Sequence, residues 1–394
     1  MRLCCKSLVV AGVLGVVPCA RGQWSYTPMH PPGATQSVIR SMGSGQVTGY
    51  VEIDGQTRAV LWQGFGASVI DLDPGVSGNS LASGSGGGQQ VGAAAAWASL
   101  WLGSAQTWVN LAPAAAFSST AAATDGIHQV GWVSFESGGA HHASMWSGSA
   151  GTWIDLNPAG SLFSEASAVS ADEQGGMSFV NGVYRASLWH GSAGSWIDLH
   201  PPGAHHSNIA GVQGGQQVGN VTGNFYQHAS LWRGIAATYV DLHPIGPEFP
   251  NTGSTGAAVF GGMQAGAVGI GGHNHASVWS STPMSWKDLH WLTPPGEFAD
   301  TVATSIWGDG RTIYVGGYGI TAPDAAGMSR LKAVLWSRPA CCAADFNCSD
   351  RIDADDIFDF LNAWFAGEDR ADLDGNGVSV LDVFGFIGAW FQGC

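Results

Sequence analysis

Short apolar segments separated by glycine-rich turns recur along most of the chain with a regular spacing. One recurring segment ends in tryptophan after Ala-Ser-Leu or a variant, at Trp62, Trp101, Trp146, Trp189, Trp232, Trp279 and Trp336. A second contains Gln-Val-Gly or a variant and begins at Gln46, Gln90, Gln129, Gln174, Gln217 and Gln264, with Tyr314 in the seventh place. Successive tryptophans lie 39 to 57 residues apart. This period predicts an array of seven similar structural units.

Each unit is long enough for four short strands joined by Gly-rich turns, and no helical period of apolar residues interrupts them. Four strands in such a unit are typical of one blade of a β-propeller. The seventh unit ends after Trp336 without the Trp-Ile-Asp-Leu strand of the others, whereas residues 26–34 align with residues 196–204, which contain that strand. We therefore expect an all-β, seven-bladed β-propeller over residues 23–340 whose last blade is completed by an N-terminal strand.

The repeated sequence motifs resemble the HAF-type repeats of bacterial extracellular proteins. The corresponding motifs here are Gln46-Val47-Thr48-Gly49 and His228-Ala229-Ser230-Leu231-Trp232, with serine in place of the phenylalanine of the HAF pattern. The resemblance covers residues 24 to 338 and implies a secreted β-repeat protein. It implies no particular chemistry.

The N-terminal residues have the order of a secretory signal. Arg2 and Lys6 precede an apolar run over residues 8–17, and the small residues Ala20 and Gly22 follow it. We expect residues 1–22 to be a signal peptide cleaved before Gln23. The apolar run is too short to span a bilayer, and no later stretch is continuously apolar for about 18 residues. The expected location is therefore secreted or at the cell surface, with no transmembrane segment.

Charge and cysteine both concentrate near the C-terminus. The formal net charge is −15, and residues 343–394 contain eleven acids against Arg351 and Arg370. Because no basic stripe exists, nucleic acid is not expected as a partner. Outside the signal peptide, the cysteines are Cys341, Cys342, Cys348 and Cys394. An even number in an oxidising compartment favours two disulfides, with three pairings open.

Residues 341–394 form a separate predicted module with two acidic loops suited to calcium. In the first loop, the expected Ca²⁺ ligands are Asp345, Asn347, Ser349, the Arg351 carbonyl, Asp353 and Asp356. In the second, they are Asp372, Asp374, Asn376, the position of Val378, and Asp382. The second loop is one residue shorter between its first ligand and its last acid, so we expect it to bind calcium more weakly.

An amphipathic helix is predicted after each loop, and the apolar residues of the two helices are related by a shift of 26 positions. These apolar residues are Ile357, Phe358, Phe360, Leu361, Trp364, Phe365 and their counterparts Val383, Phe384, Phe386, Ile387, Trp390 and Phe391. We expect these helices to pack face to face in a very small core. About 50 residues bury too little apolar area to fold alone, so calcium and disulfides would supply the remaining stability.

The duplicated loop and helix resemble type I dockerin modules, and the Ala-Trp-Phe-Gln-Gly-Cys ending resembles a GC-terminated bacterial subtype. The resemblance covers residues 342–394 and implies calcium-dependent folding with docking to a cohesin-like or cell-envelope partner. Two features depart from the pattern. The second loop is short, and Ala354 and Asp355 stand where cohesin-binding modules often carry partner-reading hydroxyl residues.

Repeated polar residues in the propeller have a structural interpretation. Asp71, Asp155, Asp198, Asp241 and Asp288 each precede a bend, with Asn110 in one unit, which predicts turn-stabilising hydrogen bonds. His142, His228 and His275 share one repeat position, and His30, His200, His243 and His290 share another. Since equivalent residues are then a blade apart, we do not expect a histidine-built metal site. The most irregular loop, residues 319–330, is the first place to look for a binding site.

No nucleophile turn, zinc-protease helix or phosphate-binding loop is present. The leading hypothesis is an exported, non-catalytic binding or surface-scaffold protein, with a carbohydrate or protein ligand on the propeller. The alternative is a secreted polysaccharide-active hydrolase or lyase, because dockerin modules commonly accompany such enzymes. In a third interpretation, the C-terminal module is an intramolecular cap with no partner.

Overall fold

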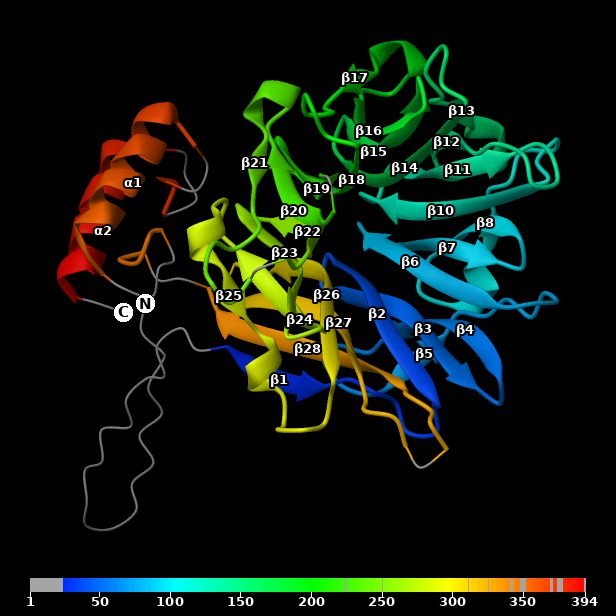
Figure 1. Ribbon diagram of the computed structural model, residues 1–394, viewed down its shortest axis with the longest axis horizontal. Helices are drawn as coiled ribbons and strands as arrows, with labels where there is room; N and C mark the ends of the chain where they lie inside the picture. The colour runs from blue at the N-terminus through cyan, green and yellow to red at the C-terminus, as the bar shows by residue number, and fades with distance from the viewer. Residues whose placement is uncertain are drawn as a thin grey trace. The chain divides into compact units, whose positions relative to one another are not determined.

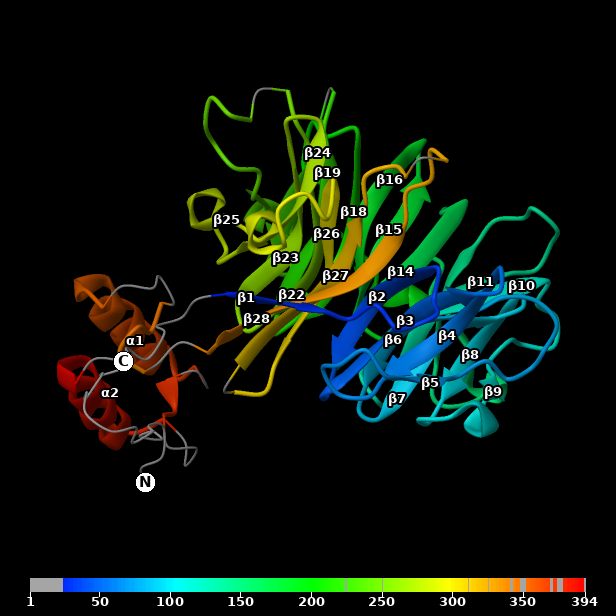
Figure 2. The same cartoon turned by 90° about the horizontal axis from the view of Figure 1, so that it is seen from below.

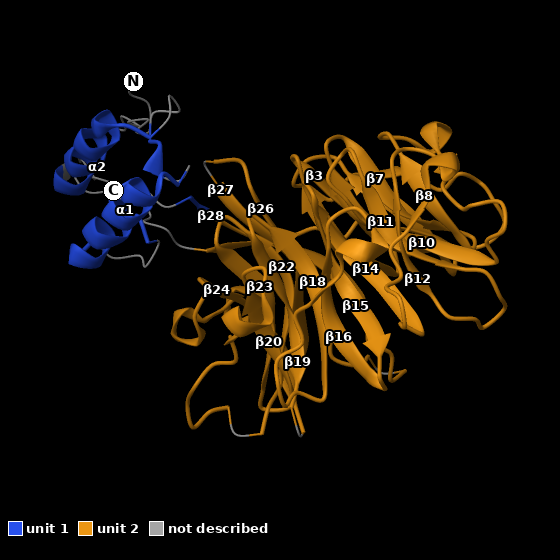
Figure 3. Cartoon of the chain, turned by 90° about the horizontal axis from the view of Figure 1, so that it is seen from above, with its two compact units in different colours: residues 1–23, 339–394 blue, residues 24–338 orange. Residues whose placement is uncertain are grey.

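The computed structural model describes residues 24–394 except 224, 250, 311, 325, 341–342, 348–351, 369–370, 374–377 and 393–394. The chain divides into two compact units, one formed by Trp24–Arg338 and the other containing residues 339–394 (Figure 3). The larger unit is a seven-bladed β-propeller, so the predicted fold is confirmed. None of the described helices is long and apolar enough to cross a membrane.

Each blade is a four-stranded antiparallel sheet, with its strands in sequence order in blades 1 to 6 and in the order β1-β28-β27-β26 in blade 7. Blades 1 and 2 contain β2 (Gln36–Gly43), β3 (Gln46–Ile53), β4 (Gln56–Trp62), β5 (Val69–Asp71) and β6 (Ser80–Gly86), β7 (Gln89–Ala94), β8 (Trp97–Trp101), β9 (Val109–Asn110). Blades 3 and 4 contain β10 (Ser118–Thr124), β11 (Gln129–Ser134), β12 (His142–Trp146), β13 (Ile154–Asp155) and β14 (Phe163–Ser170), β15 (Glu173–Val180), β16 (Val183–Trp189), β17 (Ile197–Asp198).

Blades 5 and 6 follow the same plan, with β18 (His206–Gln213), β19 (Gln216–Thr222), β20 (Gln227–Trp232), β21 (Val240–Asp241) and β22 (Ser254–Phe260), β23 (Met263–Ile270), β24 (His273–Trp279), β25 (Lys287–Asp288). Blade 7 contains β26 (Asp300–Gly308), β27 (Thr312–Ile320), β28 (Leu331–Pro339) and β1 (Ser25–Pro28). Short 3-10 helices lie at Ala105–Thr107, Ala150–Thr152, Ala193–Ser195, Ala236–Thr238, Pro283–Ser285 and His290–Leu292.

The ring is closed by the N-terminal strand, as predicted. β1 pairs antiparallel with β28, with Ser25 opposite Ser337 and Pro28 opposite Val334, so the two ends of the propeller sequence share one sheet (Figure 1). The first strands of adjacent blades contact one another around the ring, including β26 with β2. Thr304 of β26 donates a hydrogen bond to the Ile39 carbonyl of β2 at 2.7 Å. β1 therefore covers the edge of β28, so that blade 7 ends in a short outer strand like the other blades.

The repeated tryptophans form the core between blades, as the sequence pattern predicts. All seven are at most 2% exposed. Trp189 of blade 4, for example, packs with Val130, Met145 and Leu156 of blade 3. Burying an indole of this size removes a large apolar area from water at each junction. The tryptophan of one blade therefore fills the space against the preceding blade.

A hydrogen bond repeated at every junction also joins neighbouring blades. A backbone N–H on the third strand of one blade donates to the hydroxyl of a Ser or Thr on the first strand of the next. The pairs are Ala59–Ser80, Ala98–Ser119, Ala143–Ser164, Ala186–Ser207, Ala229–Ser254, Ala276–Thr301 and Ala333–Ser37, at 2.8 to 3.0 Å. The last pair spans the two ends of the propeller sequence, so the junction that closes the ring has the same bond as the others.

The glycine of the Gln-Val-Gly motif is required because the backbones of the first two strands of each blade approach closely there. A Cβ atom on Gly131 of β11 would overlap the Thr120 carbonyl oxygen of β10, and the equivalent Gly49 of β3 would overlap the carbonyl oxygen of Val38. The same conflict occurs at this position in every blade. Any side chain would force the first two strands apart.

The C-terminal unit contains helices α1 (Ala354–Ala366) and α2 (Val380–Gln392), which are related by the 26-residue shift. Phe360 and Phe386 are buried and stack with ring centroids 4.3 Å apart. The Trp364 indole donates to the Ser379 carbonyl, and the Trp390 indole donates to the Asp353 carbonyl. Each helix therefore contributes the same contact to the start of the other. The predicted face-to-face packing is confirmed for these residues.

Four of the repeated apolar residues lie outside this core. Phe358 and Phe384 are 64% and 67% exposed, and Phe365 and Phe391 are each 78% exposed. Two 13-residue helices can turn only part of their circumference toward each other, so residues on the opposite side of each helix remain outside the core. The exposed residues occur as pairs related by the same shift as the buried ones.

One prediction follows from the tryptophan indoles. The Trp62 N–H donates to the buried Met29 carbonyl at 2.9 Å, whereas the buried Trp189 N–H has no partner among the described residues. Replacing either with Phe removes the same volume, but only Trp62→Phe also leaves a carbonyl unpaired. We expect Trp62→Phe to lower the free energy of unfolding by about 1 kcal/mol more than Trp189→Phe. Equal losses in urea denaturation would contradict this account.

Candidate functional site

The aspartates at the ends of the outer strands stabilise turns, as predicted. Each accepts a hydrogen bond from the backbone N–H two residues further on. The acceptors are Asp71, Asn110, Asp155, Asp198, Asp241 and Asp288, at 2.8 to 2.9 Å. Because Asn110 makes the same bond as the aspartates, this role needs only a side-chain oxygen.

The second carboxylate oxygen of the five aspartates pairs with an arginine or histidine side chain on the adjacent third strand. The pairs are Arg58–Asp71 at 3.0 Å, His142–Asp155 at 2.9 Å, Arg185–Asp198 at 2.7 Å, His228–Asp241 at 2.8 Å and His275–Asp288 at 2.7 Å. Most of these side chains are partly exposed, so each pair contributes modestly to stability. Histidine and arginine therefore occupy one structural position and are interchangeable in the repeat.

The other histidine position clamps the junction between blades. His200 Nδ1 lies 2.7 Å from the Ser207 hydroxyl and its Nε2 lies 3.2 Å from the Ala204 carbonyl. Ser207 also accepts the inter-blade N–H, so its own hydrogen is free to bond His200 Nδ1. With Nδ1 as the acceptor, the proton of a neutral imidazole lies on Nε2, which donates to the Ala204 carbonyl. His30, His243 and His290 contact the equivalent hydroxyls, and Asn157 takes their place in blade 3.

The two histidine positions also meet within a blade. His228 stacks on His243 with ring centroids 4.2 Å apart, and His275 stacks on His290 at 4.1 Å. Stacked rings direct their nitrogens outward in parallel planes rather than toward a common point. Within the described part of the chain, no group of three or more His, Cys, Asp or Glu side chains is placed to hold a metal ion.

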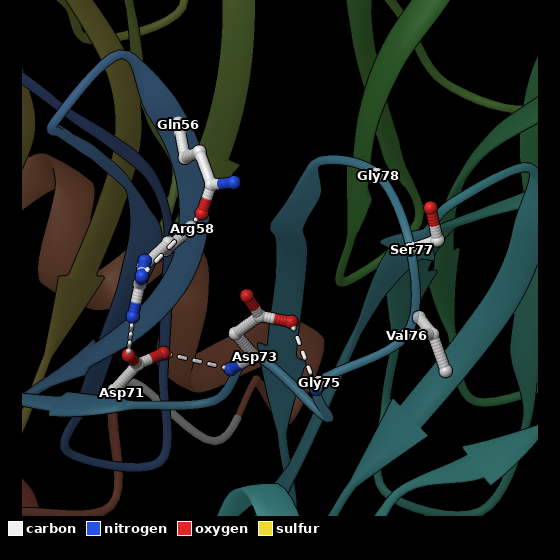
Figure 4. A pocket seen from close by; sticks show the side chains of 8 residues that line it. All are labelled: Gln56, Arg58, Asp71, Asp73, Gly75, Val76, Ser77 and Gly78. Carbon is white, nitrogen blue, oxygen red and sulfur yellow. Dashed lines mark hydrogen bonds and ion pairs between the residues drawn. The ribbon is translucent and has the colours of Figure 1, made fainter.

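Blade 1 departs from this pattern at the clamp position, where Asp73 replaces histidine. One oxygen of the Asp73 carboxylate accepts the Gly75 N–H at 3.1 Å, and the other oxygen points away from this turn (Figure 4). A surface pocket of about 400 Å³ lies here, lined by Asp73 together with Arg58, Asp71, Gln56 and Ser77. Arg58 is held in place by Asp71 at 3.0 Å and by the Gln56 side-chain oxygen at 3.4 Å.

The predicted calcium ligands are described in part. Ser349, Arg351, Asp374 and Asn376 lie outside the described residues, as do the four cysteines predicted to form disulfides. Among the others, Asp356 is fully buried at the start of α1, and its two oxygens accept the N–H groups of Asn347 and Asp353. Asp382 is 1% exposed at the start of α2. Its oxygens accept the N–H groups of Leu373 and Ser379.

These bonds locate the missing residue of the second loop. In the first loop, the N–H that bonds the closing aspartate belongs to Asn347, which lies nine residues before that aspartate and at predicted ligand position 3. In the second loop, it belongs to Leu373, which also lies nine residues before the closing aspartate but at position 2. The remaining described ligands are Asp345 and Asp353 in the first loop and Asp372 and Val378 in the second. The first ligand of the second loop therefore lies one residue closer to its closing carboxylate.

Sequence reasoning missed the pocket at Asp73. Its signal was present, since Asp73 occupies a position that is histidine in four other units, but the role of that histidine was unknown. The irregular loop over residues 319–330 is closed on itself instead. Thr321 N–H donates to the Arg330 carbonyl, and the Asp324 carboxylate accepts the N–H groups of Ala326 and Met328.

No protein family model and no curated protein matches the chain. Similar solved structures include puromycin hydrolase, 12% identical with a TM-score of 0.52, which aligns over 78% of this chain and 56% of that chain. The β-propeller domain of the Trilobed protease from Pyrococcus furiosus is 9% identical with a TM-score of 0.47, over 76% and 95% of the two chains. A GH74 enzyme from Niastella koreensis is 13% identical with a TM-score of 0.44, over 77% and 43%.

The chain thus spans about half the length of puromycin hydrolase. At these identities the likeness shows the fold alone. The activities of these proteins do not transfer to this chain.

The histidine clamps make stability depend on pH. Burial lowers the pKa of His200, and the hydrogen bond to the Ala204 carbonyl offsets this only in part. At a pH above about 6.5 both folded and unfolded states hold neutral histidine. Below it the unfolded chain takes up protons first, so the free energy of unfolding falls. His200→Asn, which copies Asn157, should flatten this fall in denaturation series between about pH 7 and pH 5. An unchanged slope would contradict the clamp.

Proposed function

We propose that the protein is an exported, non-catalytic binding or surface-scaffold protein, assembled or anchored through its C-terminal module in a calcium-dependent manner. The propeller would present the ligand-binding surface, and the module would attach it to a cohesin-like or cell-envelope partner. The duplicated closing carboxylates, Asp356 and Asp382, are the observation that supports this proposal most directly.

The chemistry of these carboxylates suits a calcium ligand. Burying an ionised carboxylate is costly unless hydrogen bonds or a cation compensate. Asp356 and Asp382 each accept two backbone N–H groups, which hold the side chain in one orientation. A carboxylate has about four lone-pair positions and can both accept hydrogen bonds and coordinate a cation. Oxygen ligands of this kind are those that Ca²⁺ prefers.

The same carboxylates also cap the helices, which links the loops to the helical core. Asp353 and Asp356 form a capping box at the start of α1, and Ser379 and Asp382 make the corresponding contacts at α2. Calcium bound at either loop would therefore fix the first turn of the following helix. We expect the first loop to be the tighter site, because the second is one residue short.

The docking surface we propose is built from exposed apolar residues of the two helices. Phe358 and Phe365 on α1 and their counterparts Phe384 and Phe391 on α2 are each at least 64% exposed. Large exposed apolar groups on so small a unit are typical of an interaction surface. Because calcium would hold both helix starts, its removal should disperse this surface.

Chelation of calcium is the test of this role. We expect the intact protein to sediment with an isolated cell-envelope fraction in calcium and to stay in solution in EGTA. Asp345→Ala should weaken this retention more than Asp372→Ala, because it alters the better-formed loop. The bound fraction is measured over a calcium titration.

Asp359→Asn is the matched control, since Asp359 is a partly exposed acid on α1 that is neither a predicted ligand nor at a predicted partner-reading position. It should behave like the unaltered protein. Retention that is insensitive to EGTA would favour the module as an intramolecular cap. Shortened polysaccharide products in parallel incubations would favour the hydrolase or lyase alternative instead.

A further inference from the structure

We infer that the pocket of about 400 Å³ beside Asp73 binds an uncharged, hydroxyl-rich ligand, namely a sugar unit of a neutral polysaccharide. This inference rests on the proposed binding role of the propeller and gives that role a place and a ligand class. The pocket lies within the size range of small-ligand sites, about 300 to 1,000 Å³. It is independent of the C-terminal module.

The lining of the pocket mixes donors and acceptors. Asp73 and the Gln56 carbonyl supply acceptors, while the Arg58 guanidinium, the Gln56 amide and the Ser77 hydroxyl supply donors. Val76 is the only apolar side chain among the lining residues that the structure describes. An apolar ligand would leave these polar groups unpaired. A hydroxyl group both donates and accepts, so a polyol can satisfy both kinds at once.

Charge excludes the other ligand classes. Asp71 is already committed, because one oxygen pairs with Arg58 and the other accepts the Asp73 N–H. The lining thus contains two carboxylates and one guanidinium, a net negative charge within a chain of net charge −15, which disfavours an anionic sugar. A calcium ion needs about six to eight oxygen ligands. Asp73 is the one carboxylate here with an oxygen not already bonded within the described residues.

The pocket lies where Asp73 stands in place of the clamp histidine of the repeat. In blade 4, His200 bonds the Ser207 hydroxyl and fills the space under the turn that follows. The Asp73 side chain is too short both to bond the equivalent hydroxyl and to fill that space, and it accepts the Gly75 N–H instead. The turn after Asp71 also comes one residue early, with Gly75 at φ 74°, whereas the turn after Asp198 has Gly203 at φ 83°.

The substitution Asp73→His tests this inference, because it restores the clamp found in blade 4. We expect the intact protein in calcium to bind neutral hexasaccharides of glucose, mannose or xylose in calorimetry. Asp73→His should weaken that binding at least about tenfold, through loss of the charged acceptor and of the open space. Its Tm should equal or exceed that of the unaltered protein, which separates loss of the pocket from loss of folding.

A matched pair of arginine substitutions supplies the control. Arg58→Gln should weaken binding, whereas Arg185→Gln, which breaks the same ion pair in blade 4, should leave it unchanged. Neutral-sugar binding that survives Asp73→His would overturn the pocket while leaving the propeller's binding role intact. Absence of neutral-sugar binding, or tighter binding of a hexagalacturonate, would overturn the inference. The envelope-retention result is independent of all three outcomes.

Discussion

The hydrogen bond from a third-strand N–H of one blade to a Ser or Thr hydroxyl of the next is the constraint on which the rest of the propeller depends. It occurs at all seven junctions. Each bond contributes about 1 kcal/mol at most to stability, but it fixes the register between neighbouring sheets. With that register set, each buried tryptophan fits against the preceding blade, and the histidine or asparagine clamp has a hydroxyl to contact. The geometry of the ring follows from repeating this junction.

Repetition explains how much of the fold the sequence could predict. The tryptophan spacing predicts seven blades, and the missing last strand identifies residues 26–34 as the strand that closes the ring. Because both patterns recur in successive units of the chain, they are not chance matches. The exposure of Phe358 and Phe384 was not predictable in this way. The 26-residue shift relates equivalent residues in the two helices but does not say which pairs face each other.

The two candidate sites also differ in how far they could be predicted from the sequence. The acidic loops are recognisable from sequence because the spacing of oxygen ligands is itself the site. The pocket is not, because it arises where Asp73 fails to make a contact that the equivalent histidines make. Only after the structure shows His200 bonded to Ser207 does a carboxylate at that position become informative. In a repeat protein, a departure from the repeat at a clamp position is therefore a place to search for a ligand.

The junction that closes the ring tests the account most directly, since it depends on residues from both ends of the propeller sequence. Ala333 donates to the Ser37 hydroxyl at 2.8 Å, and the other six alanine N–H groups make the equivalent bond. Native-state hydrogen exchange of these seven amides compares the junctions within one molecule. The account predicts that the Ala333 amide is protected to a similar degree as those of Ala143 and Ala186. Exchange of Ala333 as fast as an exposed turn amide, with the others protected, would contradict closure of the ring.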